Sequence, residues 1–138
     1  MRPELSTLYF ENQAARILED PAGFLRVIWS AQERDPLTFR AVFNHMAQAL
    51  QRRGWSRILV DQRHMRAFST TEQQWIVREW LPRAVLEAGY RYGGVLVSED
   101  VFTRLATAYV TTSVQNLPLV YRTFSHEASA NAWLLQQH

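Results

Sequence analysis

The sequence contains neither cysteine nor lysine. Without cysteine it has no disulfide, no zinc–thiolate or iron–sulfur centre and no thiol nucleophile. Without lysine it has no P-loop, and the glycine-rich dinucleotide and GxSxG hydrolase motifs are also missing. The histidines, His45, His64, His126 and His138, lack the spacing of paired metal ligands on a helix. We therefore predict no catalytic residue, no metal and no cofactor.

Long apolar runs are also missing, so no segment is predicted to cross a membrane. The opening residues, Met1 to Glu4, lack the apolar stretch of a signal peptide, and we expect a soluble cytoplasmic protein. The 15 basic and 13 acidic residues give a formal net charge of +2. Arg52, Arg53 and Arg57 form the only local basic cluster, without interleaved stacking positions, and no nucleic-acid partner is predicted.

The 138 residues, of which 47% are apolar and 12% aromatic, suffice for one domain spanning 1–138. Strands are predicted at Leu5–Glu11, Ala15–Glu19 and Phe24–Trp29, and a helix at 36–53. From Arg57 to the end, apolar runs alternate with helical patterns. The order βββαβαβαβα predicts an α/β fold, whose mixed sheet has antiparallel N-terminal strands, a parallel core and four helices.

Ser69 and Glu72 form a capping-box pattern that starts a second helix, which continues to about Ala88 and which Pro82 should kink or divide. At 100° per residue, Val77, Leu81, Ala84 and Ala88 share the face expected to enter the core. Trp75 points nearly the opposite way, close to Arg78. We therefore expect Trp75 to be poorly covered by the core and available as an interface anchor.

A third helix follows Ser98-Glu99-Asp100, and its apolar residues predict a core stripe. That stripe is Phe102, Leu105, Ala106, Tyr109, Val110 and Ser113. The opposite face, which should be exposed, holds Arg104, Thr107, Ala108 and Thr111. After a last strand at Leu119–Phe124, Ser125 is expected to cap a final helix that ends near Gln136.

Unusual side chains gather in the segment Asp61–Arg66, which leaves the carboxyl end of a buried strand, where α/β sheets place ligand sites. Asp61 could orient His64 or Arg63. Because Ser98 and His126 follow the two later parallel strands, Ser, His and Asp could converge there as an enzyme site. A polar binding surface and an ordinary solvated loop are the alternatives.

The segment Ile58–Glu72 resembles the STAS-type fold (sulfate transporter and anti-sigma factor antagonist), and the element order resembles small bacterial STAS-like proteins, sometimes grouped with CRAL-TRIO lipid carriers. Asp61 matches the Asp that ends the strand in that family, and Met65 matches the apolar anchor. Ser69-Thr70-Thr71 occupies the turn that carries the phosphorylated serine in anti-sigma antagonists. The resemblance thus implies Ser69 as a phosphoacceptor, although Phe68 and Glu72 depart from the motif.

These observations favour a non-enzymatic regulatory or protein-interaction module that binds a protein partner or self-associates, the latter through Trp75 and Arg78. Its predicted contact surface is Asp61, Arg63, His64, Arg66, Ser69, Thr70, Thr71, Trp75 and Arg78. The alternative is a domain of the CRAL-TRIO kind that binds a small apolar molecule or lipid, suggested by five Trp, five Tyr and seven Phe residues. That alternative requires an enclosed apolar pocket of a few hundred Å3.

Overall fold

One mixed sheet of six strands runs through the molecule in the order β1-β2-β3-β4-β5-β6, in the computed structural model that describes residues 6–137. Its strands are β1 (Thr7–Glu11), β2 (Ala15–Asp20), β3 (Phe24–Trp29), β4 (Arg57–Asp61), β5 (Tyr92–Leu96) and β6 (Val120–Phe124). The strands β1, β2 and β3 pair antiparallel, whereas β3 to β6 pair parallel. The α/β class and the mixed sheet predicted from the sequence are confirmed. The predicted beginning of the first strand at Leu5 lies outside the described residues.

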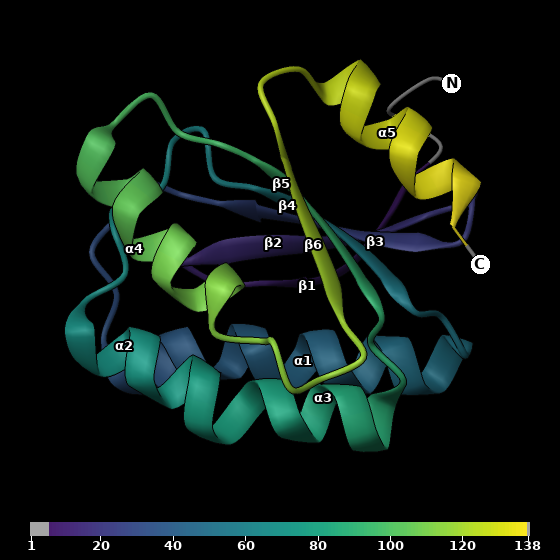
Figure 1. Cartoon of the computed structure of the whole chain (residues 1–138), viewed down its shortest axis with the longest axis horizontal. Helices are drawn as coiled ribbons and strands as arrows, with labels where there is room; N and C mark the ends of the chain where they lie inside the picture. Colours follow the sequence, from purple (N-terminus) through teal and green to yellow (C-terminus); the bar gives the residue numbers. More distant parts are fainter. Residues whose placement is uncertain (1–5, 138) are drawn as a thin grey trace.

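Helices cover the two faces of the sheet unequally (Figure 1). They are α1 (Pro36–Arg53), α2 (Thr70–Trp75), the π-helical segment η2 (Ile76–Trp80), α3 (Leu81–Ala88), α4 (Val101–Thr112) and α5 (Glu127–Gln136). The helices α1 to α4 lie on one face, and α5 lies on the other (Figure 1). The side chains of β4 alternate between these layers, because Ile58 and Val60 join the larger core while Leu59 packs below α5.

The second predicted helix is continuous from α2 through η2 to α3, with one π-helical turn before Pro82. Leu81 N–H donates to Ile76 O, five residues earlier, instead of to the residue four earlier. Pro82 has no N–H to continue the α-helical pattern, and a π turn is one way a helix absorbs that loss. Pro82 therefore does not divide the helix, one of the two outcomes predicted, and the helix instead widens into a π turn before it.

The predicted core face of this helix is confirmed at Leu81, Ala84 and Ala88 and fails at Val77, which lies within the π turn. One extra residue in a turn rotates everything after it by about 100° relative to everything before it. Ile76 and Trp80 are consequently buried together with Leu81 and Ala84, while Val77 is only half-buried. A single uninterrupted helical wheel, as used for the sequence, could not place both halves correctly.

The predicted orientation of α4 is confirmed in part: Ala106 and Val110 are buried, and Arg104 and Ala108 are exposed. It is wrong for the large apolar side chains of the predicted stripe, which face outward. Phe102 is 72% exposed, and Leu105 is 63% exposed. Thr103 and Thr107 are buried in their place, although Thr107 was expected on the exposed face. Polar partners explain this orientation: the Thr107 hydroxyl donates to the buried Gln62 Oε1 at 2.6 Å. An apolar side chain in that place would leave the Gln62 amide unpaired.

The end of the chain departs from the prediction in a smaller way. His126, not Ser125, occupies the N-cap of α5, and its side chain accepts no capping hydrogen bond. The predicted serine cap is therefore wrong, because β6 ends one residue before Ser125 and the turn runs on to His126 before the helix begins. His138 lies outside the described residues.

Candidate functional site

The loop after β4 alternates between anchors and exposed groups. Asp61, Gln62, Met65 and Phe68 are buried, and they fix the path of the loop against the core. Arg63, His64 and Arg66 lie between them and are exposed. The loop then ends at Ser69, the N-cap of α2. This alternation holds the backbone in one place and presents polar side chains outward.

A largely buried ion pair joins the first turn of α2 to the connection between β3 and α1. The Arg34 guanidinium donates to both carboxylate oxygens of Glu72, at 2.9 Å and 2.8 Å. Its side chain is only 5% exposed, and the guanidinium lies 5.6 Å from the ring centre of Trp29. The same guanidinium donates to the carbonyl oxygen of Ala67. Arg34 therefore holds two segments together that are far apart in the sequence.

The capping box predicted at Ser69 is confirmed, and it shares its carboxylate with Arg34. The Ser69 hydroxyl accepts from the Glu72 N–H at 3.0 Å, and the Ser69 N–H donates to Glu72 Oε1 at 2.9 Å. Glu72 thus neutralises a buried arginine and caps a helix with one side chain. A phosphate on Ser69 would bring two further negative charges close to this carboxylate, which opposes them.

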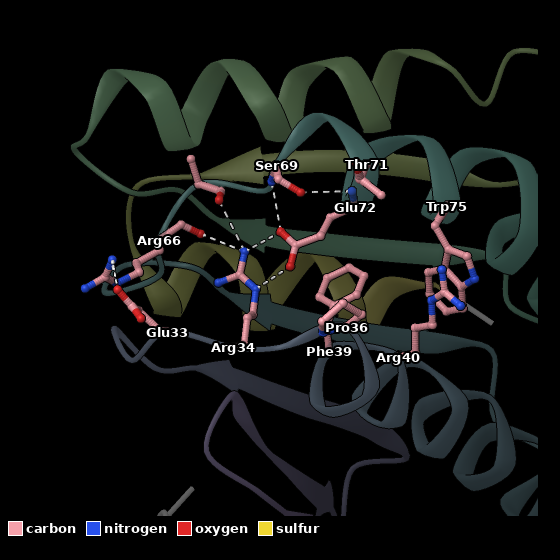
Figure 2. Close-up of a pocket in the computed structure, with 11 residues that line it drawn as sticks. Glu33, Arg34, Pro36, Phe39, Arg40, Arg66, Ser69, Thr71, Glu72 and Trp75 are labelled. Carbon is pink, nitrogen blue, oxygen red and sulfur yellow. Dashed lines mark hydrogen bonds and ion pairs between the residues drawn. The ribbon is translucent and has the colours of Figure 1, made fainter.

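An open groove of about 360 Å3 lies between these two segments (Figure 2). We call it the β3–α2 groove. It is lined by Glu33, Arg34, Pro36, Phe39, Arg40, Arg66, Ala67, Ser69, Thr71, Glu72 and Trp75. Four residues predicted as a contact surface, Arg66, Ser69, Thr71 and Trp75, therefore meet in one cavity. Thr70 and Arg78 are exposed but do not line it.

Trp75 is half-buried, which corrects the expectation that the core covers it poorly. Its ring meets Phe39 and Phe43 of α1 edge-on, each with ring centres 5.8 Å apart. The cause is helix α1, which packs against this side of α2 and supplies a wall that no helical wheel of α2 alone contains. The remaining exposed part of Trp75 closes one end of the groove.

Two exposed arginines stand at the ends of the groove, as Figure 2 shows. The Arg40 guanidinium lies 5.3 Å from the ring centre of Trp75, and among the described residues it has no carboxylate partner. Arg66 donates to the carbonyl oxygen of Ala31 and approaches Glu33 at 3.8 Å. That pair is worth little, because both side chains are mostly exposed. Both arginines thus remain able to meet an anionic group.

Asp61 and Arg63 belong to a different cluster, on the face of the sheet that carries α5. Asp61 accepts from the Arg63 guanidinium at 2.7 Å and 3.0 Å, so it orients Arg63 rather than His64. Burial alone would raise the pKa of Asp61, but the hydrogen bonds from Arg63 outweigh burial and hold the pKa below its usual value. Arg63 also reaches Glu127 of α5, which in turn accepts from Arg26. This network ties α5 to the sheet.

His64 lines a wide, open cavity of about 800 Å3 at the carboxyl ends of β4, β5 and β6. Ser98 and His126 line it too, but Asp61 does not, so the possible convergence of Ser, His and Asp is met only in part. The chemistry of a nucleophilic site is not assembled, however. The Ser98 hydroxyl accepts from the Asp100 N–H, and the Asp61 carboxylate is held by Arg63.

A small cavity of about 30 Å3 lies in the core, lined by residues that include Gln62, Thr107, Tyr90 and Tyr121. This volume suits about one water molecule. An apolar ligand or lipid would need ten times that volume, so the core would have to open to admit one.

Sequence reasoning missed Arg34, Arg40, Pro36 and Phe39 as groove residues. Arg34 belongs to the charged run Glu33-Arg34-Asp35, a pattern typical of a solvent-exposed loop. Nothing in the sequence indicates that Arg34, unlike its neighbours, is buried. Arg40 could have been found, because it lies one residue after the core position Phe39 on the edge of the α1 stripe.

No protein-family model, no curated protein and no solved structure matches this chain. No helix within residues 6–137 is long and apolar enough to span a membrane. Over the same range, no group of three or more His, Asp or Glu side chains is arranged to hold a metal ion. The functional proposal rests on the residues of the chain itself.

Proposed function

We propose that this chain is a non-enzymatic, STAS-like interaction module that binds an acidic and apolar segment of a partner protein in the β3–α2 groove. The observation that carries the proposal is the distribution of charge around an apolar floor. Pro36, Phe39 and Trp75 line the groove between Arg66 at one end and Arg40 at the other (Figure 2). A segment with an apolar side chain between two carboxylates matches that arrangement.

The charges of Arg34 and Glu72 cancel inside the groove, so a ligand finds unpaired positive charge only at the two ends of the groove. Arg34 is paired with Glu72, and breaking this buried pair to bind a ligand would cost more than a surface contact returns. The two outer arginines carry no such bond to a buried carboxylate. Arginine suits this task because its planar guanidinium binds a carboxylate with two parallel hydrogen bonds.

The resemblance to STAS-like proteins agrees with this proposal. Its motif residues flank the groove: Met65 anchors the loop in the core, and Ser69 lines the rim. A regulatory phosphate at Ser69 would place negative charge beside the groove and would repel an acidic segment. A phosphate there would therefore release a partner, although the Glu72 carboxylate disfavours its addition.

A selection from a random peptide library, with the purified full-length chain as bait, tests the proposal. We expect enrichment of peptides that place Asp or Glu beside Leu, Phe or Trp. Those peptides should bind the charge-reversed Arg40→Glu, Arg66→Glu protein at least tenfold more weakly, because its two new carboxylates repel those of the peptide. A tenfold loss of affinity corresponds to about 1.4 kcal/mol.

The matched control is Arg83→Glu, which reverses an exposed arginine of α3 that does not line the groove. This variant has the charge change of one groove substitution and should keep the peptide affinity. Selection of basic peptides, or equal affinity for the groove variant and the wild type, overturns the proposal. Binding of a phospholipid instead of any peptide would favour the carrier alternative.

A further inference from the structure

The outward face of α4 is a largely apolar stripe without any charged side chain. It consists of Val101, Phe102, Leu105, Ala108, Tyr109 and Thr112, all of them exposed. At 100° per residue these positions fall within an arc of about 120°. None of them lines the β3–α2 groove, so this surface is independent of the proposed function.

The fold itself gives no reason for this stripe to be apolar. Helices on the surface of a domain ordinarily turn their apolar side inward. In α4 the Thr103 hydroxyl donates inward to Asp100 Oδ2 and lies 3.3 Å from the Met65 carbonyl oxygen, while Thr107 bonds to Gln62. Phe102 meanwhile is 72% exposed. A contiguous exposed apolar patch of this kind marks an interaction surface.

We propose that a second copy of this chain covers the stripe, with the two α4 helices antiparallel about a twofold axis near Leu105. In that arrangement Leu105 meets its own counterpart. Phe102 and Ala108 each lie three residues from Leu105, so Phe102 of one copy meets the small Ala108 of the other. In the same way Val101 of one copy meets Tyr109 of the other. A large side chain thus faces a small one on both sides of the axis, as ridges-into-grooves packing requires.

The lack of charge on the stripe allows a second copy to cover it. Two identical surfaces meet without repulsion only where neither carries a net charge, and the stripe carries none. The nearest charged side chain on the helix is Arg104, which lies at the border of the stripe and is exposed. Its long side chain can keep the guanidinium in water while its methylene groups line the rim.

The available area fits a reversible dimer. The exposed parts of Val101, Phe102, Leu105 and Tyr109 together amount to roughly 400 Å2 per copy, by the usual sizes of such side chains. The polar rim of α4 adds to this. Interfaces of about 800 Å2 per partner form stable complexes, and smaller ones are transient. The expected dimer is therefore weak and transient.

Sedimentation equilibrium of the full chain over a concentration series tests the proposal. The wild type should show a monomer–dimer equilibrium, and Leu105→Glu should raise the dissociation constant at least about 30-fold, because it buries two carboxylates against each other. The control Leu86→Glu changes a leucine on α3 that is 77% exposed, and it should leave the equilibrium unchanged. A wild type that stays monomeric up to about 1 mM, or a dimer that Leu105→Glu does not weaken, overturns the proposal.

Cross-linking keeps the test valid if Leu105→Glu disturbs folding. Because the chain has no cysteine, a single Leu105→Cys substitution gives one reactive site per copy. A short bis-maleimide should join two Leu105→Cys chains at least about tenfold faster than two Leu86→Cys chains, since only the former are held close together. Equal rates for the two variants would refute the antiparallel arrangement.

Discussion

Arg34 and Glu72 form a buried, two-pronged ion pair across 38 residues of sequence, and the same carboxylate caps the helix that begins after Ser69. The pair fixes the connection between β3 and α1 against the start of α2. These are the two walls of the β3–α2 groove. The shape of the proposed binding surface consequently depends on this one interaction.

Removing the arginine should destabilise the protein strongly. In Arg34→Ala the Glu72 carboxylate, only 16% exposed, loses its partner, and we expect a loss of about 3 kcal/mol in the free energy of unfolding. Urea denaturation measures this. In Arg66→Ala, whose side chain is 59% exposed, the loss should stay below about 1 kcal/mol. A similar cost for both variants would show that burial of the pair does not matter.

The inward hydroxyl of α4 should be needed to satisfy the buried Gln62. Thr107→Val keeps the volume but leaves Gln62 Oε1 without its donor, at an expected cost of about 1–3 kcal/mol in thermal or urea unfolding. Adding Gln62→Leu should recover part of that loss, because both polar groups are then gone. No cost in the single variant would contradict the polar explanation for the orientation of α4.

Gly93 and Gly94 are neighbours in β5 with opposite tolerance of a side chain. A Cβ at Gly93 would collide with the Tyr121 ring and lie 2.5 Å from the Tyr90 hydroxyl, whereas one at Gly94 would meet Leu134 at an ordinary 3.5 Å. We expect Gly93→Ala to lose about 2–3 kcal/mol of stability and Gly94→Ala to change little. Chemical denaturation of both variants compares them. A larger loss of stability in Gly94→Ala than in Gly93→Ala would contradict the close packing of Tyr90 and Tyr121 against Gly93.

The Tyr90 and Tyr121 hydroxyls, 3.2 Å apart, should make the fold sensitive to strong base. Burial raises the pKa of Tyr121 to about 12 and raises that of Tyr90 well above its usual value of 10.0. For these acids the folded state holds the proton more tightly. Their contribution to stability is therefore complete below pH 10 and is lost as the pH rises through about 12.

Near-ultraviolet absorbance of tyrosinate follows this titration. The part of the tyrosinate absorbance that appears only at high pH should rise together with unfolding. The Tyr121→Phe substitution should make that part of the absorbance smaller. The control Tyr109→Phe, on the exposed stripe, should leave it unchanged. Ionisation of all tyrosines below pH 11, with the fold intact, would disagree with a buried pair, because about one pH unit separates that value from the pKa of Tyr121.

Regular elements were predictable because their signals are local. Asp35 followed by Pro36 begins α1, and the left-handed Gly54 ends it, as the sequence indicates. The run Ile58-Leu59-Val60 is apolar throughout because both faces of β4 are covered. Such features depend on neighbours in the chain, which the sequence shows directly.

The orientation of helices and the groove depend on distant partners, which the sequence does not display. The inward face of α4 is decided by Gln62, 45 residues before Thr107. Trp75 is covered by Phe39 and Phe43 of α1. Arg34 and Glu72 pair across 38 residues of sequence. Each of these side-chain positions depends on a polar partner or on the packing of another helix. The spacing of apolar residues along the sequence predicts neither.

The most direct test of the interaction module is an NMR titration of the full chain with a peptide from the selection. Amide and indole N–H signals report which surface the peptide covers, and Trp75 is one of five tryptophans whose indole signals can be followed. The account predicts that the largest shifts fall on Phe39, Ser69, Thr71 and the Trp75 indole, and that they disappear in Arg40→Glu, Arg66→Glu. Shifts concentrated instead on α4 or around His64 and His126 would contradict it.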